Sequence, residues 1–164
     1  MLEGMTIAAY AVGASHGYIY LRAEYFYLKD KIEREIKKFE NKGYLGNNIL
    51  GIPGFDFDIK VHMGAGAYIC GEETALISSM EGKRGEPSTK EYFPVEKGLF
   101  GEPTVINNVE TLCAVPRILS MSIDKYLKIG TQATKGTKLL SVSGDCRKPG
   151  IYEIEWGMKL VDFL

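Results

Sequence analysis

Two adjacent glutamates, Glu72 and Glu73, stand where a glycine-rich stretch gives way to a helix-forming one, so their carboxylates are well placed to meet a ligand. The alternating apolar run 55–63 predicts a strand, residues 64–71 a glycine turn, and residues 74–80 a helix. Strand, glycine turn and helix start form the arrangement in which α/β proteins hold nucleotides. Glycine admits close backbone approach, and the helix start presents free N–H groups.

The charge of these two glutamates narrows the kind of ligand that the turn suits. Carboxylates at Glu72 and Glu73 disfavour a bound phosphate and favour recognition of hydrogen-bond donors on a ring or a ribose. The spacing of the glycines also matches neither the dinucleotide fingerprint nor a P-loop. Acidic residues in a first helical turn also complement the helix dipole without any ligand. The residues alone leave both interpretations open.

The composition is that of a water-compatible globular chain. Its 164 residues suit one medium domain, or one domain and part of another, and 45% of them are hydrophobic. A net charge of −1 gives no electrostatic case for nucleic acid, and no apolar run approaches the roughly 20 residues of a bilayer span. We therefore expect no nucleic-acid partner and no direct membrane insertion, and the cysteines, which show no disulfide framework, favour a cytoplasmic setting.

The cysteines and histidines do not form a recognisable metal or disulfide pattern. Cys70, Cys113 and Cys146 are far apart and odd in number, and no CxxC or CxxH spacing occurs. No basic residue beside Cys70 marks it as a nucleophile, so we interpret it as a packing residue. His16 and His62 are too isolated for metal or triad chemistry. The sequence predicts no metal ligands.

The first part of the chain is predicted to alternate helices and strands around the glycine turn. We expect a small-residue helix over 2–15, a short strand over 18–21 and an amphipathic helix over 25–42, with Gly43 as the residue after its C-terminus. The apolar stripe of the amphipathic helix consists of Leu28, Ile32, Ile36 and Phe39.

A long loop and a capped helix follow the glutamates. Residues 81–103 contain several glycines and prolines and predict an irregular surface loop of the length that is usually functional or disordered. In the next helix Asn107 stands three residues before Glu110, which predicts a capping box, with Asn108 as the alternative cap.

The last part of the sequence changes to a β pattern. Residues 130–137 resemble a linker, and the runs 138–143 and 151–155 flank a Pro-Gly turn, which predicts a hairpin. The chain stops on apolar residues, and we therefore expect it to be a fragment cut inside its second domain.

The residues also carry a resemblance to a known family. The run from Gly64 to Leu76, GAGAYICGEETAL, resembles the signature of the NADH-binding flavoprotein subunit of respiratory complex I. The same module occurs in NAD-linked formate dehydrogenases and in NADH-dependent hydrogenases. Further agreement comes, in the same order, from residues 4–20, residues 93–94 with 98–101, and residues 103–111. The resemblance covers nearly the whole chain.

The resemblance implies a fold and a domain division. It implies an α/β class, with a partial Rossmann-like FMN-binding layer over residues 1–129 and a linker over 130–137. The beginning of a β-grasp, ubiquitin-like domain would follow over 138–164. In the family the hydride of NADH passes to FMN, and the protein positions and tunes the two cofactors.

The resemblance also implies site residues at matching positions. Those implied for FMN are Tyr68, Gly71, Glu72, Asn107, Asn108 and Thr111. Those implied for NADH are Glu73, Lys90 and Phe93, with Glu73 as the carboxylate that faces the nicotinamide and hence the catalytic candidate. Glu91 and Tyr92 precede Phe93 where the family often has prolines, a departure that bears on Lys90. Asn107 and Asn108 have a cap role as their alternative, and Phe93 a packing role.

Parts of the family pattern lie outside this chain. The glycine-rich loop that cradles the FMN phosphate precedes it, and the cysteines of the 4Fe-4S centre follow it. We therefore expect the fragment alone to be inactive, with NADH and other electron-transfer subunits as partners of the parent protein. The alternatives are a flavoprotein subunit of a soluble NAD-linked hydrogenase or formate dehydrogenase and, from another class, a non-catalytic ligand-binding or assembly module.

Overall fold

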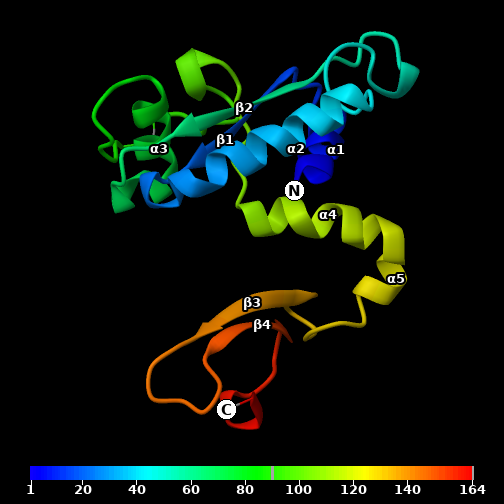
Figure 1. Ribbon diagram of the computed structural model, residues 1–164, viewed down its shortest axis with the longest axis vertical. Helices are drawn as coiled ribbons and strands as arrows, with labels where there is room; N and C mark the ends of the chain where they lie inside the picture. The colour runs from blue at the N-terminus through cyan, green and yellow to red at the C-terminus, as the bar shows by residue number, and fades with distance from the viewer. Residues whose placement is uncertain (90, 164) are drawn as a thin grey trace. The chain divides into compact units, whose positions relative to one another are not determined.

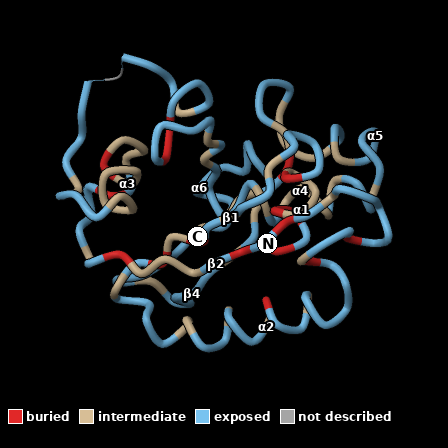
Figure 2. The backbone as a smooth tube through the Cα atoms, turned by 90° about the horizontal axis from the view of Figure 1, so that it is seen from above, coloured by how far each residue is buried: buried red, intermediate tan, exposed pale blue. Residues whose placement is uncertain are grey.

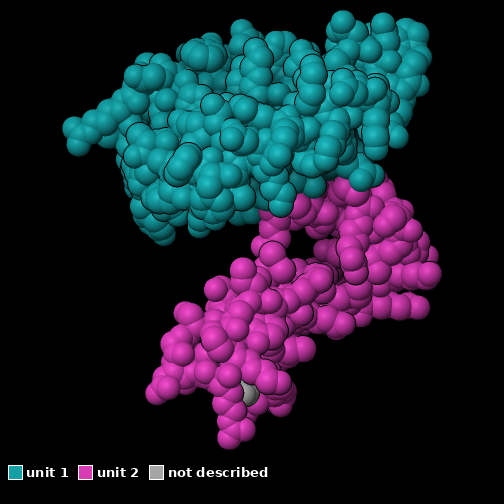
Figure 3. Space-filling model, in the orientation of Figure 1, with its two compact units in different colours: residues 1–109 teal, residues 110–164 magenta. Residues whose placement is uncertain are grey.

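The computed structural model describes residues 1–89 and 91–163. The chain forms two compact units, Met1–Val109 and Glu110–Leu164, which Figure 3 shows in different colours. Each unit has its own secondary structure, and we describe each by itself.

The first unit is built on a strand–helix–strand element. Its main helices and strands are α1 (Leu2–Val12), β1 (His16–Leu21), α2 (Lys29–Asn41), β2 (Asp58–Met63) and α3 (Glu73–Met80) (Figure 1). Short 3-10 turns connect them: η1 (Ala23–Leu28), η2 (Ile49–Gly51), η3 (Tyr68–Gly71) and η4 (Leu99–Gly101). The predicted alternation of helices and strands is confirmed.

The two strands of the first unit run parallel, with His16 opposite Asp58 and Leu21 opposite Met63. Because side chains alternate along a strand, Ile19 and Leu21 share one face and are buried there. Most of the buried hydrophobic residues of the unit lie along the strands and the helices that cover them, and the others lie in the turns between these elements (Figure 2). On this face Met5 of α1 and Ile36 of α2 contribute to the core.

The opposite face connects the strands to α3. Tyr20 lies on it and makes a hydrogen bond of 3.0 Å with the hydroxyl of Ser79 in α3. Gly64, directly after β2, lies under the same ring, and a Cβ at this glycine would come within 2.5 Å of the Tyr20 oxygen. Both strands end near α3 (Figure 1), so the glycine turn and the start of α3 lie at their carboxyl ends.

Several predicted boundaries shift. The helix expected over 2–15 ends at Val12, before Gly13 (φ +73°), and the strand expected from residue 18 begins at His16. The helix expected from residue 25 begins at Lys29, because residues 23–28 form η1 with a non-helical Tyr25 (φ −104°, ψ 20°). The strand expected from residue 55 begins at Asp58, because Phe57 is engaged in an isolated bridge with Gly46. Gly43 (φ +71°) ends α2 as predicted, and its N–H donates to the carbonyl of Glu40.

The second unit contains α4 (Val109–Met121, which begins at the last residue of the first unit), α5 (Ile123–Tyr126), β3 (Thr137–Val142), β4 (Gly150–Glu155) and α6 (Leu160–Phe163). The strands β3 and β4 pair antiparallel, with Thr137 opposite Glu155, and confirm the predicted hairpin.

Packing in the second unit is sparse. Among its described residues no large apolar side chain is buried, whereas the described part of the first unit buries thirteen hydrophobic residues. Polar contacts hold the second unit instead: the carboxylate of Glu110 in α4 accepts the N–H of Leu139 in β3 at 2.8 Å, and the Lys138 ammonium lies over the Trp156 ring. No helix in the described part of either unit has the length and apolar character that a bilayer span requires.

Candidate functional site

Glu72 is held rigidly at the start of α3. It is the N-cap of the helix, and its Oε2 accepts hydrogen bonds from the N–H of Thr74 (2.9 Å), the hydroxyl of Thr74 (2.5 Å) and the N–H of Ala75 (3.0 Å). A carboxylate in this position satisfies N–H groups that the helix cannot pair internally and faces the positive end of its dipole. The side chain is therefore fixed by the backbone that follows it.

The expected FMN residues on either side of Cys70 face solvent. Tyr68 in η3 is 88% exposed, and Gly71 is exposed at the end of the same turn. A Cβ built on Gly71 meets no atom within 4 Å, and the residue lacks the positive φ that favours glycine elsewhere. Nothing within the described chain thus requires glycine at this position. The surface beside Glu72 is open for a flat ligand to lie against the backbone.

Cys70 points the other way, into the protein. It is only 5% exposed, and its Sγ lies against Gly85 of the segment 82–104, where a Cβ would come within 2.5 Å of the sulfur. The carbonyl of Ala75 and the Cβ of Ser79 lie on the same side of Gly85. The packing role expected for Cys70 is confirmed by this burial.

The segment 82–104 is attached to the N-terminal end of α3 by a hydroxyl. The N–H of Ser88 donates a hydrogen bond to Oγ1 of Thr74 at 2.9 Å, and the same hydroxyl donates a hydrogen bond to Oε2 of Glu72. Thr74 therefore joins the segment to the fixed carboxylate. This role of Thr74 was not predicted from the sequence, where the available signal was a threonine two residues after an acidic N-cap.

The same segment is attached to the C-terminal end of α3 by a carboxylate. Oε1 of Glu81 accepts the N–H of Phe100 at 2.8 Å, and its Oε2 accepts from the Lys83 ammonium at 2.7 Å. The Lys83 bond, then the Phe100 N–H, hold the pKa of Glu81 below its ordinary value of 4.5. Phe100 has a left-handed backbone (φ +53°), which is unfavourable for a non-glycine residue, so this bond also steadies a strained turn.

Phe93 lies within this attached segment. Its carbonyl accepts the N–H groups of Glu96 and Lys97, and its own N–H donates to the Glu96 carboxylate at 3.1 Å, so the residue sits on a compact turn. Its ring is exposed, and its packing alternative receives no support from burial. Lys90, the other predicted dinucleotide residue of the segment, lies outside the described residues.

The asparagines lie before α4. The helix begins at Val109, so the alternative cap Asn108 holds the position before the first turn and Asn107 precedes it. Both asparagines are exposed in the first unit, and Thr111 is exposed in α4 within the second unit.

Of the predicted site residues, the structure brings Tyr68, Gly71, Glu72 and Glu73 together, on the turn η3 and the start of α3.

Beneath this turn lies a small polar cluster. Burial raises the pKa of the Tyr20 phenol, while its hydrogen bond with Ser79 opposes the shift and the neighbouring Cys70 thiol adds to it. Tyr20 and Ser79 connect β1 to α3, so the cluster supports the helix that carries Glu72 and Glu73. Among the described residues no group of three or more His, Cys, Asp or Glu is arranged to hold a metal ion.

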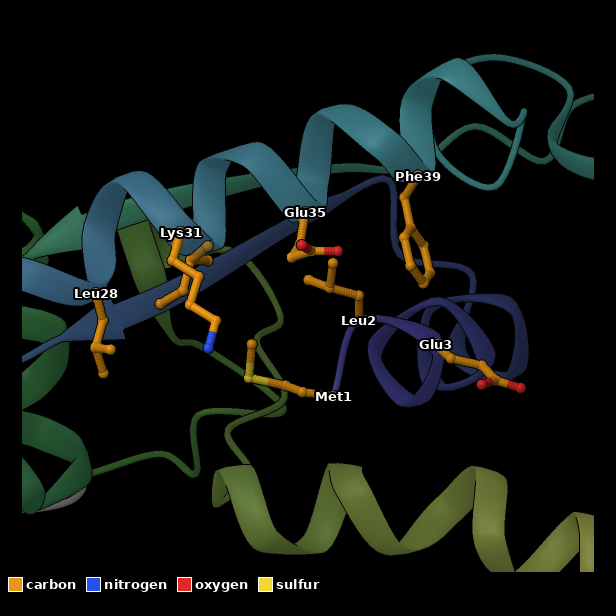
Figure 4. A pocket seen from close by; sticks show the side chains of 8 residues that line it. Met1, Leu2, Glu3, Leu28, Lys31, Glu35 and Phe39 are labelled. Atoms are coloured by element: carbon orange, nitrogen blue, oxygen red, sulfur yellow. The ribbon is translucent and has the colours of Figure 1, made fainter.

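A separate cavity of about 450 Å³ lies between α1 and α2 (Figure 4). Leu2 and Phe39 point into it from the two helices, and Lys31 and Glu35 stand at its margin. It contains none of the residues predicted to bind FMN or NADH. The candidate site is therefore the open surface at the start of α3.

Comparison with known proteins identifies relatives over the whole chain. The family model of the Nuo51 FMN-binding domain matches residues 1–117. The chain is 57% identical to the alpha subunit of the NAD-reducing hydrogenase HoxS of Cupriavidus necator, over 98% of this chain and 27% of that protein. It is 56% identical to a subunit of the NADH-quinone oxidoreductase of Aquifex aeolicus, over 94% of this chain and 36% of that protein.

A solved structure agrees with these relatives. The crystal structure of an NAD⁺-reducing [NiFe]-hydrogenase in the H2-reduced state superposes with a TM-score of 0.88 and 40% identity, over 99% of this chain and 27% of that one. The chain spans about a quarter to a third of the length of the relatives that it matches.

Proposed function

The chain belongs to the Nuo51 FMN-binding family, and from that premise we propose that it forms part of a flavoprotein subunit that takes a hydride from NADH onto FMN. The observation that carries the proposal is the start of α3. There the Glu72 carboxylate, fixed by three hydrogen bonds, lies beside the exposed Gly71. Neither packing nor backbone conformation within the described chain requires a glycine at this position. This is the geometry that a flat ring with hydrogen-bond donors needs.

The residues present suit the ring of FMN. Gly71 leaves room for a planar group against the backbone, and the exposed Tyr68 is available to lie beside it. Glu72 would accept a hydrogen bond from a ring N–H or a ribityl hydroxyl. Residues 64–73 contain no lysine, arginine or histidine that could bind a phosphate. From the family resemblance we also propose Asn107, Asn108 and Thr111 as FMN contacts.

We assign the NADH side of the site to Glu73 and to the segment 82–104. Glu73, in the first turn of α3, would face the nicotinamide, while Phe93 and Lys90 would contact the adenine end. FMN, when bound, supplies the acceptor for the hydride of NADH. The chain supplies orientation, exclusion of water and negative charge, which shift the flavin potential and favour release of the product.

The fold that we propose around this site is a Rossmann-like layer over residues 1–129. The parallel β1–β2 pair with α2 between the strands in sequence supports it. For residues 138–164, after a linker at 130–137, we propose the start of a β-grasp domain, for which the antiparallel hairpin is the support.

We further propose that the chain is one portion of a longer protein, because it matches only about a third of its relatives. Elsewhere that protein would hold the FMN phosphate and a 4Fe-4S centre, and it would work in the cytoplasm with other electron-transfer subunits. Quinone is one acceptor, through a complex like that of the Aquifex relative. The hydrogenase relative supports a soluble hydrogenase as the alternative.

A flavin titration tests this function. FMN fluorescence quenching would be measured with this chain, with the full-length natural gene product, and with Gly71→Ala in the full-length protein. We expect tight binding by the full-length protein, weak or no binding by the chain, and weaker binding by Gly71→Ala, since its methyl group would occupy ring space. Absence of binding by the full-length protein would overturn the proposal in favour of a non-catalytic module.

A further inference from the structure

Thr74 connects the two sides of the proposed site through one hydroxyl group. Its Oγ1 accepts the N–H of Ser88 at 2.9 Å and donates to Oε2 of Glu72 at 2.5 Å. A threonine hydroxyl has one proton and two lone pairs, so it can make both bonds at once. Glu72 belongs to the flavin side, and Ser88 begins the stretch that leads to Phe93 on the dinucleotide side.

The geometry of this connection is constrained at every point. Thr74 is partly buried on a helix whose first turn is capped, and Oε2 of Glu72 is fixed by two backbone N–H groups in addition to the hydroxyl. The position of Ser88 relative to Glu72 therefore depends on the Thr74 hydroxyl. Between Met80 and Phe100, the other described side-chain link of the segment to α3 is the Glu81 bond at the opposite end of the helix.

We propose that Thr74 is a positioning residue for hydride transfer, an inference that rests on the proposed function. Its hydroxyl sets the distance between the flavin-binding carboxylate and the segment proposed to hold the adenine end of NADH, and through the bound dinucleotide it affects how the nicotinamide meets the flavin. Transfer between two bound rings is steeply sensitive to their separation, and a misplacement of about 1 Å can cost about a hundredfold in rate.

The test uses the full-length, FMN-loaded protein and three variants. Thr74→Val keeps the shape of the side chain and removes both hydrogen bonds, and Thr74→Ser keeps the hydroxyl. Ser78→Ala is the matched control. It removes a hydroxyl from the same helix, and this hydroxyl makes no hydrogen bond within the described part of the chain. The readouts are flavin content, the rate of flavin reduction by saturating NADH in stopped flow without oxygen, and the kinetic isotope effect with NADH deuterated at the transferred position.

We expect Thr74→Val to reduce flavin at a rate lower by about tenfold to a hundredfold per bound flavin, with a larger isotope effect. Thr74→Ser should recover most of the rate, and Ser78→Ala should match the wild type. A purely structural role would lower flavin content and leave the rate per bound flavin unchanged, and that result would overturn the inference.

A second variant covers the case in which Thr74→Val does not retain FMN. Ser88→Pro deletes the N–H donor and leaves the bond between Thr74 and Glu72 intact. A slowed reduction rate in this variant supports the inference, and an unchanged rate contradicts it. Failure of the wild type itself to be reduced by NADH would instead overturn the proposed function.

Discussion

The two ends of α3 hold the same segment by different chemistry. At the N-terminal end a neutral hydroxyl, that of Thr74, accepts a hydrogen bond from the N–H of Ser88 and donates one to the capping carboxylate of Glu72. At the C-terminal end a carboxylate, Glu81, accepts the N–H of Phe100 and pairs with Lys83. We call these the hydroxyl attachment and the carboxylate attachment.

The hydroxyl attachment and the carboxylate attachment have different roles. The hydroxyl attachment leads directly to the residues proposed to bind FMN and NADH, and no titration in its hydroxyl disturbs it near neutral pH. The carboxylate attachment lies at the other end of α3 and steadies a strained turn at Phe100. We therefore expect changes near the hydroxyl attachment to affect ligand chemistry, and changes at the carboxylate attachment to affect stability and its dependence on pH.

The largest expected effect comes from the close approach between the two attachments. Gly85→Ala places a methyl group within 2.5 Å of the buried Sγ of Cys70, so that the thiol or the segment 82–104 must shift. Such overpacking lowers the free energy of unfolding by about 1–3 kcal/mol. Urea denaturation followed by circular dichroism measures the loss.

Two controls make this prediction specific. The double variant Cys70→Ala with Gly85→Ala should be less destabilised than the sum of the single variants, because removal of the sulfur makes room for the methyl group. Gly71→Ala meets no neighbouring atom and should leave stability unchanged or slightly higher. Strict additivity in the double variant would show that the clash with Cys70 is not the cause.

The next effect concerns the cap that the hydroxyl attachment uses. Glu72→Ala removes the acceptor of three hydrogen bonds and should lower the free energy of unfolding by about 0.5–2 kcal/mol, as the loss of an N-cap does elsewhere. Glu72→Gln keeps an acceptor oxygen and should lose less. Equal losses in the two variants, measured by urea denaturation, would mean that the cap bonds contribute little.

A smaller effect is expected at the carboxylate attachment, and it should depend on pH. Glu81→Gln keeps an oxygen for Phe100 but loses the charge, at a cost of about 0.5–1.5 kcal/mol at pH 7. Because folding lowers the pKa of Glu81 below 4.5, the wild-type advantage is complete above that pH. It declines as the pH falls through the lowered folded value.

The measurement is the difference in free energy of unfolding between the wild type and Glu81→Gln from pH 7 to pH 3. A difference that stays constant across this range would contradict the assignment to the ionised carboxylate.

The smallest effect is expected on the outer surface of the segment. Arg84 and Glu86 form an ion pair of 2.9 Å, but their side chains are 86% and 62% exposed. Arg84→Ala should therefore change the free energy of unfolding by less than about 0.5 kcal/mol. A loss above 1 kcal/mol would show that the segment is held by more than its two attachments and the contact at Gly85.

The parts of the fold that could be predicted follow from short-range patterns. The apolar alternation of β2, the stripe of α2 and the glycine at its end are all visible within a few residues of sequence. The start of β2 was placed too early because Phe57 pairs with Gly46, a residue far outside the local pattern. The start of α2 was placed too early because η1 continues the apolar spacing in a different helical geometry.

The candidate site divides in the same way. The grouping of Tyr68, Gly71, Glu72 and Glu73 is contiguous in the sequence and was predicted. The role of Thr74 was missed, because its partner Ser88 stands fourteen residues away in a stretch that has no periodicity. The segment predicted as an irregular loop is similarly ordered by a bond across nineteen residues, between Glu81 and Phe100.

The parallel pair in the first unit also has a consequence for the time course of folding. Residues opposite each other in β1 and β2 are 42 positions apart, whereas those in the β3–β4 hairpin are at most 18 apart. Closing the longer connection costs more chain entropy before any strand pairing offsets it. Isolated hairpins form in about 1–10 μs, so we expect β3 and β4 to pair before the parallel strands do. The strand pair that leads to Glu72 would then assemble after this local piece, and the binding surface would form later than the hairpin.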